Sequence, residues 1–125
     1  MLIADDLPDA ARSLAMLFEM YGADVRISFD GRQTVRAAED FRPEVVLMDI
    51  SMPGMSGYDA ARAIRGAPWG QAMILVALTG WGRTRDLEAA RAAGFDDYLL
   101  KPVDPEKLLE VITRLRAQRG APPAR

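Results

Sequence analysis

Short apolar runs alternate with segments of helical periodicity along the whole chain. The apolar runs consist largely of aliphatic and β-branched residues, which favour strands. One of them, Glu44-Val45-Val46-Leu47-Met48, is almost continuously apolar, as expected for a strand that helices cover on both faces. The predicted strands are residues 1–4, 23–29, 44–48, 72–78 and 97–100.

Between these runs, apolar residues recur every three or four positions, which predicts amphipathic helices. The predicted helices are residues 8–21, 34–41, 58–65 and 84–93, and a last helix that begins near 104. The side chains expected to face the core are Ala11, Leu14, Ala15, Phe18 and Tyr21 in the first helix, Val35, Ala38 and Phe41 in the second, and Leu108, Val111, Ile112 and Leu115 in the last.

Glycine, proline and acidic residues mark the expected ends of these helices. Gly22, Pro43 and Gly94 are predicted to end three of them. The pair Asp30-Gly31 predicts a turn. Asp104 is the expected N-cap of the last helix, with Pro105 at its first position.

Five βα units with short connections predict an α/β fold, a doubly wound parallel sheet with helices on both faces. Five strands favour the flavodoxin-like strand order 2-1-3-4-5. The length of 125 residues fits one domain. We expect this domain to span residues 1–119. Residues 120–125 are the predicted tail or linker stub, since their glycine and prolines cannot extend a helix.

The amino-acid composition excludes several classes of partner and of catalytic mechanism. The net charge of −2 does not suggest a surface that neutralises nucleic-acid phosphates. No apolar run approaches the ~18 residues of a membrane span, and no secretory signal follows Met1, so we expect a cytoplasmic protein without direct nucleic-acid or membrane partners. The chain has neither cysteine nor histidine, which excludes thiolate nucleophiles, Ser-His-Asp hydrolysis and a phosphohistidine within it.

Polar residues follow the predicted strands where a ligand would bind. In doubly wound sheets ligands bind beyond the carboxyl ends of the strands, near the switch point of the strand order. The residues at these ends are Asp5, Asp6, Asp49, Thr79 and Lys101. Three carboxylates there would repel one another unless a hard cation such as Mg²⁺ joined them. An anionic group held between this cation and the lysine is most simply a phosphoryl group, and Asp49 is then a candidate nucleophile.

Four segments in this order and spacing resemble the receiver domain of response regulators over essentially the whole chain. They are Asp5-Asp6, residues 49–59 (DISMPGMSGYD), Leu78-Thr79-Gly80 and residues 94–102 (GFDDYLLKP). Residues 77–82 (ALTGWG) are further similar to receiver domains attached to hybrid sensor histidine kinases.

The resemblance implies a role for each matched residue. Asp49 is the implied phosphoacceptor, and Thr79 and Lys101 would contact the phosphoryl oxygens. Thr79 and Tyr98 would be the switch residues, and the peptide bond between Lys101 and Pro102 would be cis. The implied ligands of Mg²⁺ are Asp6 directly, Asp5 largely through water, Asp49, and the backbone carbonyl of Ser51.

A partner is obligatory in this interpretation. The phosphoryl donor would be a histidine kinase or a histidine phosphotransfer protein, or a kinase covalently attached in the full-length chain. The domain would then be a switch that catalyses only its own phosphorylation and dephosphorylation. Gly80 and Trp81 depart from the commonest receiver pattern. The indole of Trp81 would either shield the acyl phosphate from water, or pack on the next helix or mark a partner surface.

Three functions are alternatives to a phosphorylatable receiver domain. A phosphatase of the haloacid-dehalogenase type needs a second aspartate two residues after the nucleophile, where this chain has Ser51, and it needs a cap domain. A flavin or nucleotide carrier needs a Gly/Ser/Thr-rich phosphate loop after the first strand, where this chain has Asp5-Asp6-Leu7-Pro8-Asp9. A receiver kept only as a scaffold would not need all the site residues, and they are all present. The cognate kinase and the output are not given by the sequence.

Overall fold

The computed structural model describes residues 1–80 and 84–118, without the side chains of 84–86. Its centre is a five-stranded sheet with the order β2-β1-β3-β4-β5, and every pair of neighbouring strands is parallel. This confirms the predicted flavodoxin-like α/β arrangement. The strands are β1 (Leu2–Ala4), β2 (Arg26–Ser28), β3 (Val45–Asp49), β4 (Ile74–Thr79) and β5 (Asp97–Leu100).

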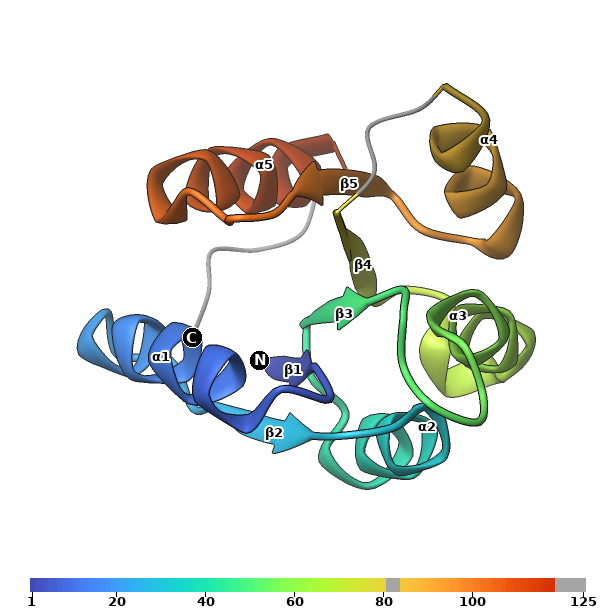
Figure 1. Ribbon diagram of the computed structural model, residues 1–125, viewed down its shortest axis with the longest axis horizontal. Helices are drawn as coiled ribbons and strands as arrows, with labels where there is room; N and C mark the ends of the chain where they lie inside the picture. The colour runs from blue at the N-terminus through green and yellow to red at the C-terminus, as the bar shows by residue number, and fades with distance from the viewer. Residues whose placement is uncertain (81–83, 119–125) are drawn as a thin grey trace.

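The α-helices cover both faces of the sheet, as Figure 1 shows. One face carries α1 (Pro8–Met20) and α5 (Pro105–Gln118). The other carries α2 (Gly31–Phe41), α3 (Gly57–Gly66) and α4 (Thr84–Ala93). A short 3-10 helix that the sequence pattern did not predict, η1 (Pro68–Gly70), connects α3 to β4.

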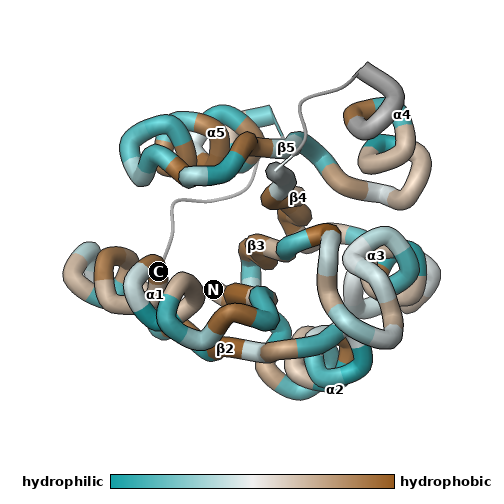
Figure 2. The backbone as a smooth tube through the Cα atoms, in the orientation of Figure 1, coloured by the Kyte–Doolittle hydropathy of each residue, from teal (hydrophilic) through white to brown (hydrophobic). Residues whose placement is uncertain are grey.

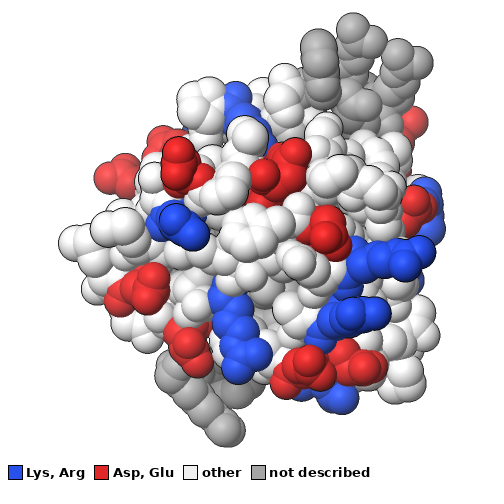
Figure 3. Space-filling model, turned by 60° about the horizontal axis from the view of Figure 1, so that its bottom comes forward, with Lys and Arg blue, Asp and Glu red and all other residues white. Residues whose placement is uncertain are grey.

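The core lies on both faces of the two central strands. Every residue of β3 and β4 is buried, and Figure 2 shows much of these two strands in the brown of hydrophobic residues. Burial on both faces explains why these strands appear in the sequence as continuous rather than alternating apolar runs. Figure 3 shows acidic and basic side chains interspersed on the face it presents, in keeping with the small net charge.

Helix α2 begins earlier than the sequence analysis predicted. Its first residue is Gly31 rather than Thr34, because Asp30 acts as an N-cap and accepts a hydrogen bond from the Gln33 N–H at 2.8 Å. The Asp30-Gly31 pair is therefore a helix start and not only a turn. Ser56 plays the same part for α3, where its hydroxyl accepts from the Asp59 N–H at 3.2 Å.

The buried stripe predicted for the first helix is correct for Ala11, Ala15 and Phe18 and wrong for Tyr21, whose side chain is 63% exposed. The helix ends at Met20, so Tyr21 has left helical geometry and no longer lies on the stripe. Leu14 is half-buried.

In α2, Ala38 is fully buried, whereas Val35 and Phe41 are half-buried. The guanidinium of Arg26 covers the Phe41 ring at 4.3 Å.

The last helix starts as predicted. The Glu106 N–H donates to the Asp104 carboxylate at 3.0 Å, and Leu108, Ile112 and Leu115 are buried while Val111 is half-buried. The predicted tail, 120–125, lies outside the described residues, so the proposed domain boundary stays a prediction. Within the described ranges, no helix combines the length and the apolar character needed to cross a membrane.

Candidate functional site

The site is formed at the carboxyl edge of the sheet, where four strands end side by side. Asp5 directly follows β1, Asp49 is the last residue of β3, and Thr79 is the last residue of β4. Lys101 directly follows β5, where its N–H donates to the Thr79 carbonyl at 2.8 Å. Parallel register brings these residues to one edge, since Ala4 pairs with Met48 and Asp49 pairs with Leu78.

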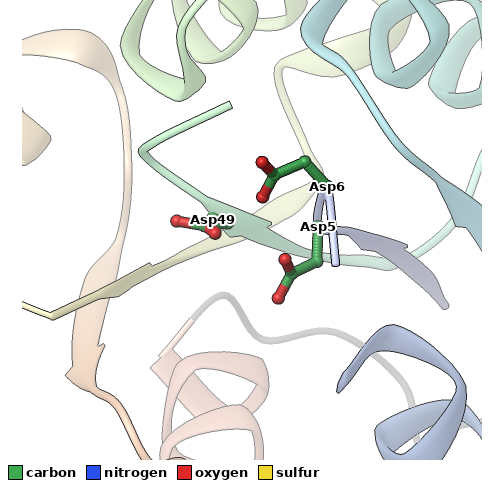
Figure 4. Close-up of side chains that lie close together, drawn as sticks. All are labelled: Asp5, Asp6 and Asp49. Carbon is green, nitrogen blue, oxygen red and sulfur yellow. The ribbon is translucent and has the colours of Figure 1, made fainter. Parts of the chain in front are cut away.

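Three carboxylates meet at this edge. Asp5, Asp6 and Asp49 each offer a carboxylate oxygen within 4.8 Å of the other two, and Figure 4 shows them at the ends of β1 and β3. Asp5 and Asp49 are buried, with 4% and 5% of their surface exposed, and Asp6 is more exposed. The cluster concentrates negative charge where little water can screen it.

Burial raises the pKa of Asp5 above its ordinary value, because a carboxylate loses hydration there. The Leu7 N–H, which donates to Asp5 Oδ1 at 3.0 Å, and the charge of Lys101 both oppose this rise, and the charge of Asp49 adds to it. The pKa of Asp5 stays raised although Lys101 is near, so the charged form of Asp5 is disfavoured until a further cation binds beside it.

Lys101 supplies the positive charge. Its Nζ donates to Asp49 Oδ2 at 2.7 Å and lies 3.4 Å from Asp5 Oδ2. Burial acts to lower the pKa of Lys101, but the hydrogen bond and charge of Asp49, followed by those of Asp5, outweigh it and raise the pKa overall. The side chain is therefore a stable ammonium, fixed opposite the carboxylates.

The second oxygen of Asp49 is held by the backbone of the following loop. The Ser51 N–H donates to Asp49 Oδ1 at 3.0 Å, while the Ser51 side chain lies at the surface. Both oxygens of Asp49 thus accept a hydrogen bond, which fixes the plane of the carboxylate. The peptide bond between Lys101 and Pro102 is cis, as the resemblance implied.

Comparison with known proteins assigns the family. Residues 1–113 match the response regulator receiver domain. The chain belongs to this family. Receiver domains are signalling domains of two-component systems rather than conventional enzymes.

Relatives of this receiver domain include full-length regulators and single domains. The DNA-binding response regulator MtrA of Mycolicibacterium smegmatis is 35% identical over 97% of the chain, which spans only 52% of the length of MtrA. Protein PilH of Pseudomonas aeruginosa is 35% identical, with 93% of this chain and 96% of PilH covered.

Solved structures agree with the fold. The receiver domain of the sensor histidine kinase PA1611 from Pseudomonas aeruginosa was determined with a magnesium ion coordinated in its active site cleft. Its structure has a TM-score of 0.82 against this receiver domain, at 32% identity, with 96% of each chain covered.

The carboxylate cluster fits the Mg²⁺ ion that receiver domains bind at their acidic site. The donor atoms are hard oxygens, several of them charged, and they lie close enough together to share one cation. The repulsion among the three carboxylates is itself a reason for a cation there, since among the described residues one ammonium, that of Lys101, pairs with them.

The structure brings together the predicted site residues Asp5, Asp6, Asp49 and Lys101, with Thr79 buried at the adjoining strand end. Tyr98 lies on β5, half-buried, and lines a pocket of about 460 Å³ together with Leu100 and Lys101. Trp81 lies outside the described residues.

Sequence reasoning missed the part played by Gly57 beside the site. A Cβ atom there would lie 2.7 Å from the Asp49 carbonyl oxygen and 2.8 Å from Ile50 Cα. Only glycine allows α3 to start so close to the backbone of Asp49. A glycine directly after an N-capping serine was the signal available in the sequence.

Proposed function

We propose that this receiver domain accepts a phosphoryl group on Asp49 from the phosphohistidine of a histidine kinase or phosphotransfer protein in the cytoplasm. The observation that supports this most directly is the environment of the Asp49 carboxylate. It is buried at a strand end, 2.7 Å from the Lys101 ammonium and within 4.8 Å of two further carboxylates. A buried acid with these neighbours is suited to reaction more than to packing.

In the proposed reaction, a carboxylate oxygen of Asp49 attacks the phosphorus atom of the donor. An O–P bond forms as the P–N bond of the phosphohistidine breaks, and the imidazole leaves with the electron pair. The hydrogen bonds that Ser51 and Lys101 donate to Asp49 hold the carboxylate in one plane, and the ammonium offsets charge on the phosphoryl oxygens.

The proposed ligands of Mg²⁺ are Asp5, Asp6, Asp49 and the Ser51 carbonyl. Bound Mg²⁺ would neutralise carboxylate and phosphoryl charge, as it does in other phosphoryl transfers. Asp5 and Asp6 have no other proposed part in the reaction. The dephosphorylation that returns the switch to rest would use the same residues.

The proposed switch residues are Thr79 and Tyr98. Thr79 would donate its hydroxyl to a phosphoryl oxygen. Its carbonyl already accepts from the N–H of Lys101, which directly follows β5, so a shift at the end of β4 would reach the strand that carries Tyr98. The partner surface of the domain would change in this way.

A haloacid-dehalogenase-type phosphatase is not favoured by the geometry near Asp49. That chemistry needs a carboxylic acid two residues after the nucleophile to protonate the leaving group. Here the residue is Ser51, whose side chain lies at the surface and whose backbone N–H faces the carboxylate instead.

Incubation with acetyl phosphate and Mg²⁺ tests the proposal without any kinase. We expect the mass of one phosphoryl group to be added to the parent, labile to hydroxylamine as an acyl phosphate is. Asp49→Asn should not be labelled, because the amide is not a nucleophile. Chelation of Mg²⁺ should suppress labelling of the parent, since the Lys101 ammonium does not fully compensate three carboxylates, and they would repel the donor.

Ser51→Ala is the matched control, because it keeps the backbone N–H and carbonyl and removes only an exposed hydroxyl. It should be labelled like the parent. Labelling of Asp49→Asn at the parent rate would contradict the proposal, since the acceptor would then be another residue.

A further inference from the structure

The loop between β3 and α3 carries Ser51 and has few backbone hydrogen bonds of its own. Ile50 N–H donates to the Leu78 carbonyl at 3.1 Å, and Gly57 N–H donates to the Ile50 carbonyl at 3.0 Å. Both bonds fix the ends of the loop. The buried side chain of Met52 anchors its middle in the core. The backbone around Met55 needs another support if the Ser51 carbonyl is to stay in one place.

The first residue of α2 provides that support. Gly31 is buried, and a Cβ atom built on it would collide with the carbonyl oxygen of Met55 and lie 2.7 Å from Met55 Cβ. Gly31 is not in the left-handed region, so its backbone conformation does not require glycine. The requirement is space, because the loop backbone lies directly against the helix.

The start of α2 is itself well anchored, so it cannot easily move away from the loop. The Asp30 carboxylate caps the helix by accepting from the Gln33 N–H. Thr34 donates its hydroxyl to the Asp30 carbonyl at 2.7 Å and is paired with the buried Ser28 hydroxyl at 2.7 Å. A side chain at position 31 would therefore displace the loop rather than the helix.

We infer that Gly31 is a positioning residue for the metal-binding loop: its lack of a side chain lets the start of α2 support Met55 and so holds the Ser51 carbonyl beside the carboxylates. Gly31 itself touches neither the metal nor the phosphoryl group. The inference rests on the proposed function, in which Ser51 is a ligand of Mg²⁺.

Glycine-to-alanine substitutions at three sites separate positioning from general stability. Gly31→Ala should raise the Kd for Mg²⁺ by about tenfold, the lower end of the range for mutation of groups that orient metal ligands. At Gly70 an added Cβ would collide with an even closer backbone atom, the carbonyl oxygen of Ile64, but Gly70 lies in η1, before the amino end of β4. Gly70→Ala should lower stability and leave the Kd unchanged. At Gly66 an added Cβ would meet open space, so Gly66→Ala should leave the Kd unchanged and not lower stability.

The readouts are Mg²⁺ titration by calorimetry and the NMR resonance of the Ser51 amide in the metal-free protein. This amide donates to Asp49 Oδ1, so displacement of the loop should shift its resonance in Gly31→Ala and not in Gly70→Ala. Equal Mg²⁺ affinity and equal Ser51 resonances in these two variants would overturn the inference.

Two further measurements keep the inference testable if Gly31→Ala does not fold, and distinguish its failure from failure of the proposed metal site. If Gly31→Ala does not fold, the parent protein is titrated with Mg²⁺ and followed by NMR. The Gly31 amide resonance should then shift more than that of Gly66, and equal shifts would overturn the inference. Asp6→Ala should abolish most Mg²⁺ binding. If the parent and Asp6→Ala bound Mg²⁺ equally, the proposed metal site would fail, whatever the result at Gly31.

Discussion

At the scale of single residues, the site shows a conflict between burial and charge. Asp5 is nearly inaccessible to water, and its pKa is raised chiefly for that reason. A group whose pKa is raised on folding stabilises the protein below its ordinary pKa, and this contribution is lost as the pH rises through the folded value. Without a bound cation, ionised Asp5 therefore lowers the stability of the domain at neutral pH.

We expect Asp5→Asn to stabilise the metal-free protein at pH 7 by about 1 kcal/mol, a common size for single substitutions. Asparagine carries no charge, and its Oδ1 can still accept from the Leu7 N–H. The advantage should disappear below the ordinary pKa of 3.8, where Asp5 is protonated in both states. Urea unfolding in the presence of a chelator at pH 7 and at pH 3 measures both quantities.

Asp40→Asn is the control, because Asp40 is an exposed acid on α2. Removing this exposed charge should change the free energy of unfolding at pH 7 by less than about 0.5 kcal/mol. A loss of stability in Asp5→Asn at pH 7 would mean that attraction to Lys101 outweighs the cost of burial.

The residues of the site were predictable because chemistry and topology both constrain them. Strands that end in acids or a lysine are unusual in a sequence, and a parallel sheet places such ends together. The opposite holds for Gly31 and Gly57, whose importance depends on how closely two backbones approach. Residue types do not report that distance, and the one signal in the sequence was that Gly57 directly follows Ser56, a residue type that caps helices.

At the scale of secondary-structure elements, Arg65 near the end of α3 connects segments that are distant in the sequence. Its guanidinium donates to the carbonyls of Gly70, Gln71, Met73 and Gly94 at 2.6–3.1 Å. It also donates to the Asp96 carboxylate at 2.7 Å, and Asp96 in turn accepts from the Leu75 N–H at 2.8 Å. The starts of β4 and β5 are thus tied to α3.

Arg65→Lys should destabilise the fold by about 3 kcal/mol, since one ammonium cannot replace a planar guanidinium that serves five acceptors. Arg62→Lys is the matched control, because among the described residues Arg62 forms one exposed ion pair, with Asp59. This substitution should change stability by less than about 0.5 kcal/mol. Urea unfolding of both variants measures the difference, and equal stabilities would show that the Arg65 contacts contribute little.

The order and type of the elements followed from hydrophobic periodicity, whereas several boundaries did not. The predicted second strand extended over residues 23–29, but only Arg26–Ser28 form β2. Residues before it bond elsewhere: the Ala23 N–H donates to the Phe18 carbonyl, and the Asp24 carbonyl accepts from the amino terminus. Apolar residues at the end of a helix and at the start of a strand look alike in a sequence.

At the scale of the whole molecule, the site and the proposed partner surface lie on adjoining strands. Thr79 pairs with Leu100, and Ala77 pairs with Tyr98, so β4 and β5 connect the acceptor to the half-buried tyrosine. Tyr98 packs against the core cluster under α2, α3 and α4.

Phosphorylation or a beryllofluoride adduct should therefore shift the backbone NMR resonances of Tyr98 and the start of α5 as well as those of the site. Tyr98 and the start of α5 line one pocket with Lys101, so movement around the lysine should reach them. Gly70, in η1 before the amino end of β4, serves as the internal control and should stay unchanged. Shifts confined to the active-site loops would leave phosphorylation intact and exclude this route.

The pairing of Lys101 with Asp49 and Asp5 has a thermodynamic consequence. In the metal-free protein the ammonium is a tethered counterion, so an arriving divalent cation competes with a charge that never leaves the domain. Once the cation also binds the carboxylates, they attract the Lys101 ammonium less strongly. The ammonium can then interact more strongly with an anion. Occupancy by one ion then strengthens the binding of the other, and reciprocity requires the same coupling free energy in both directions.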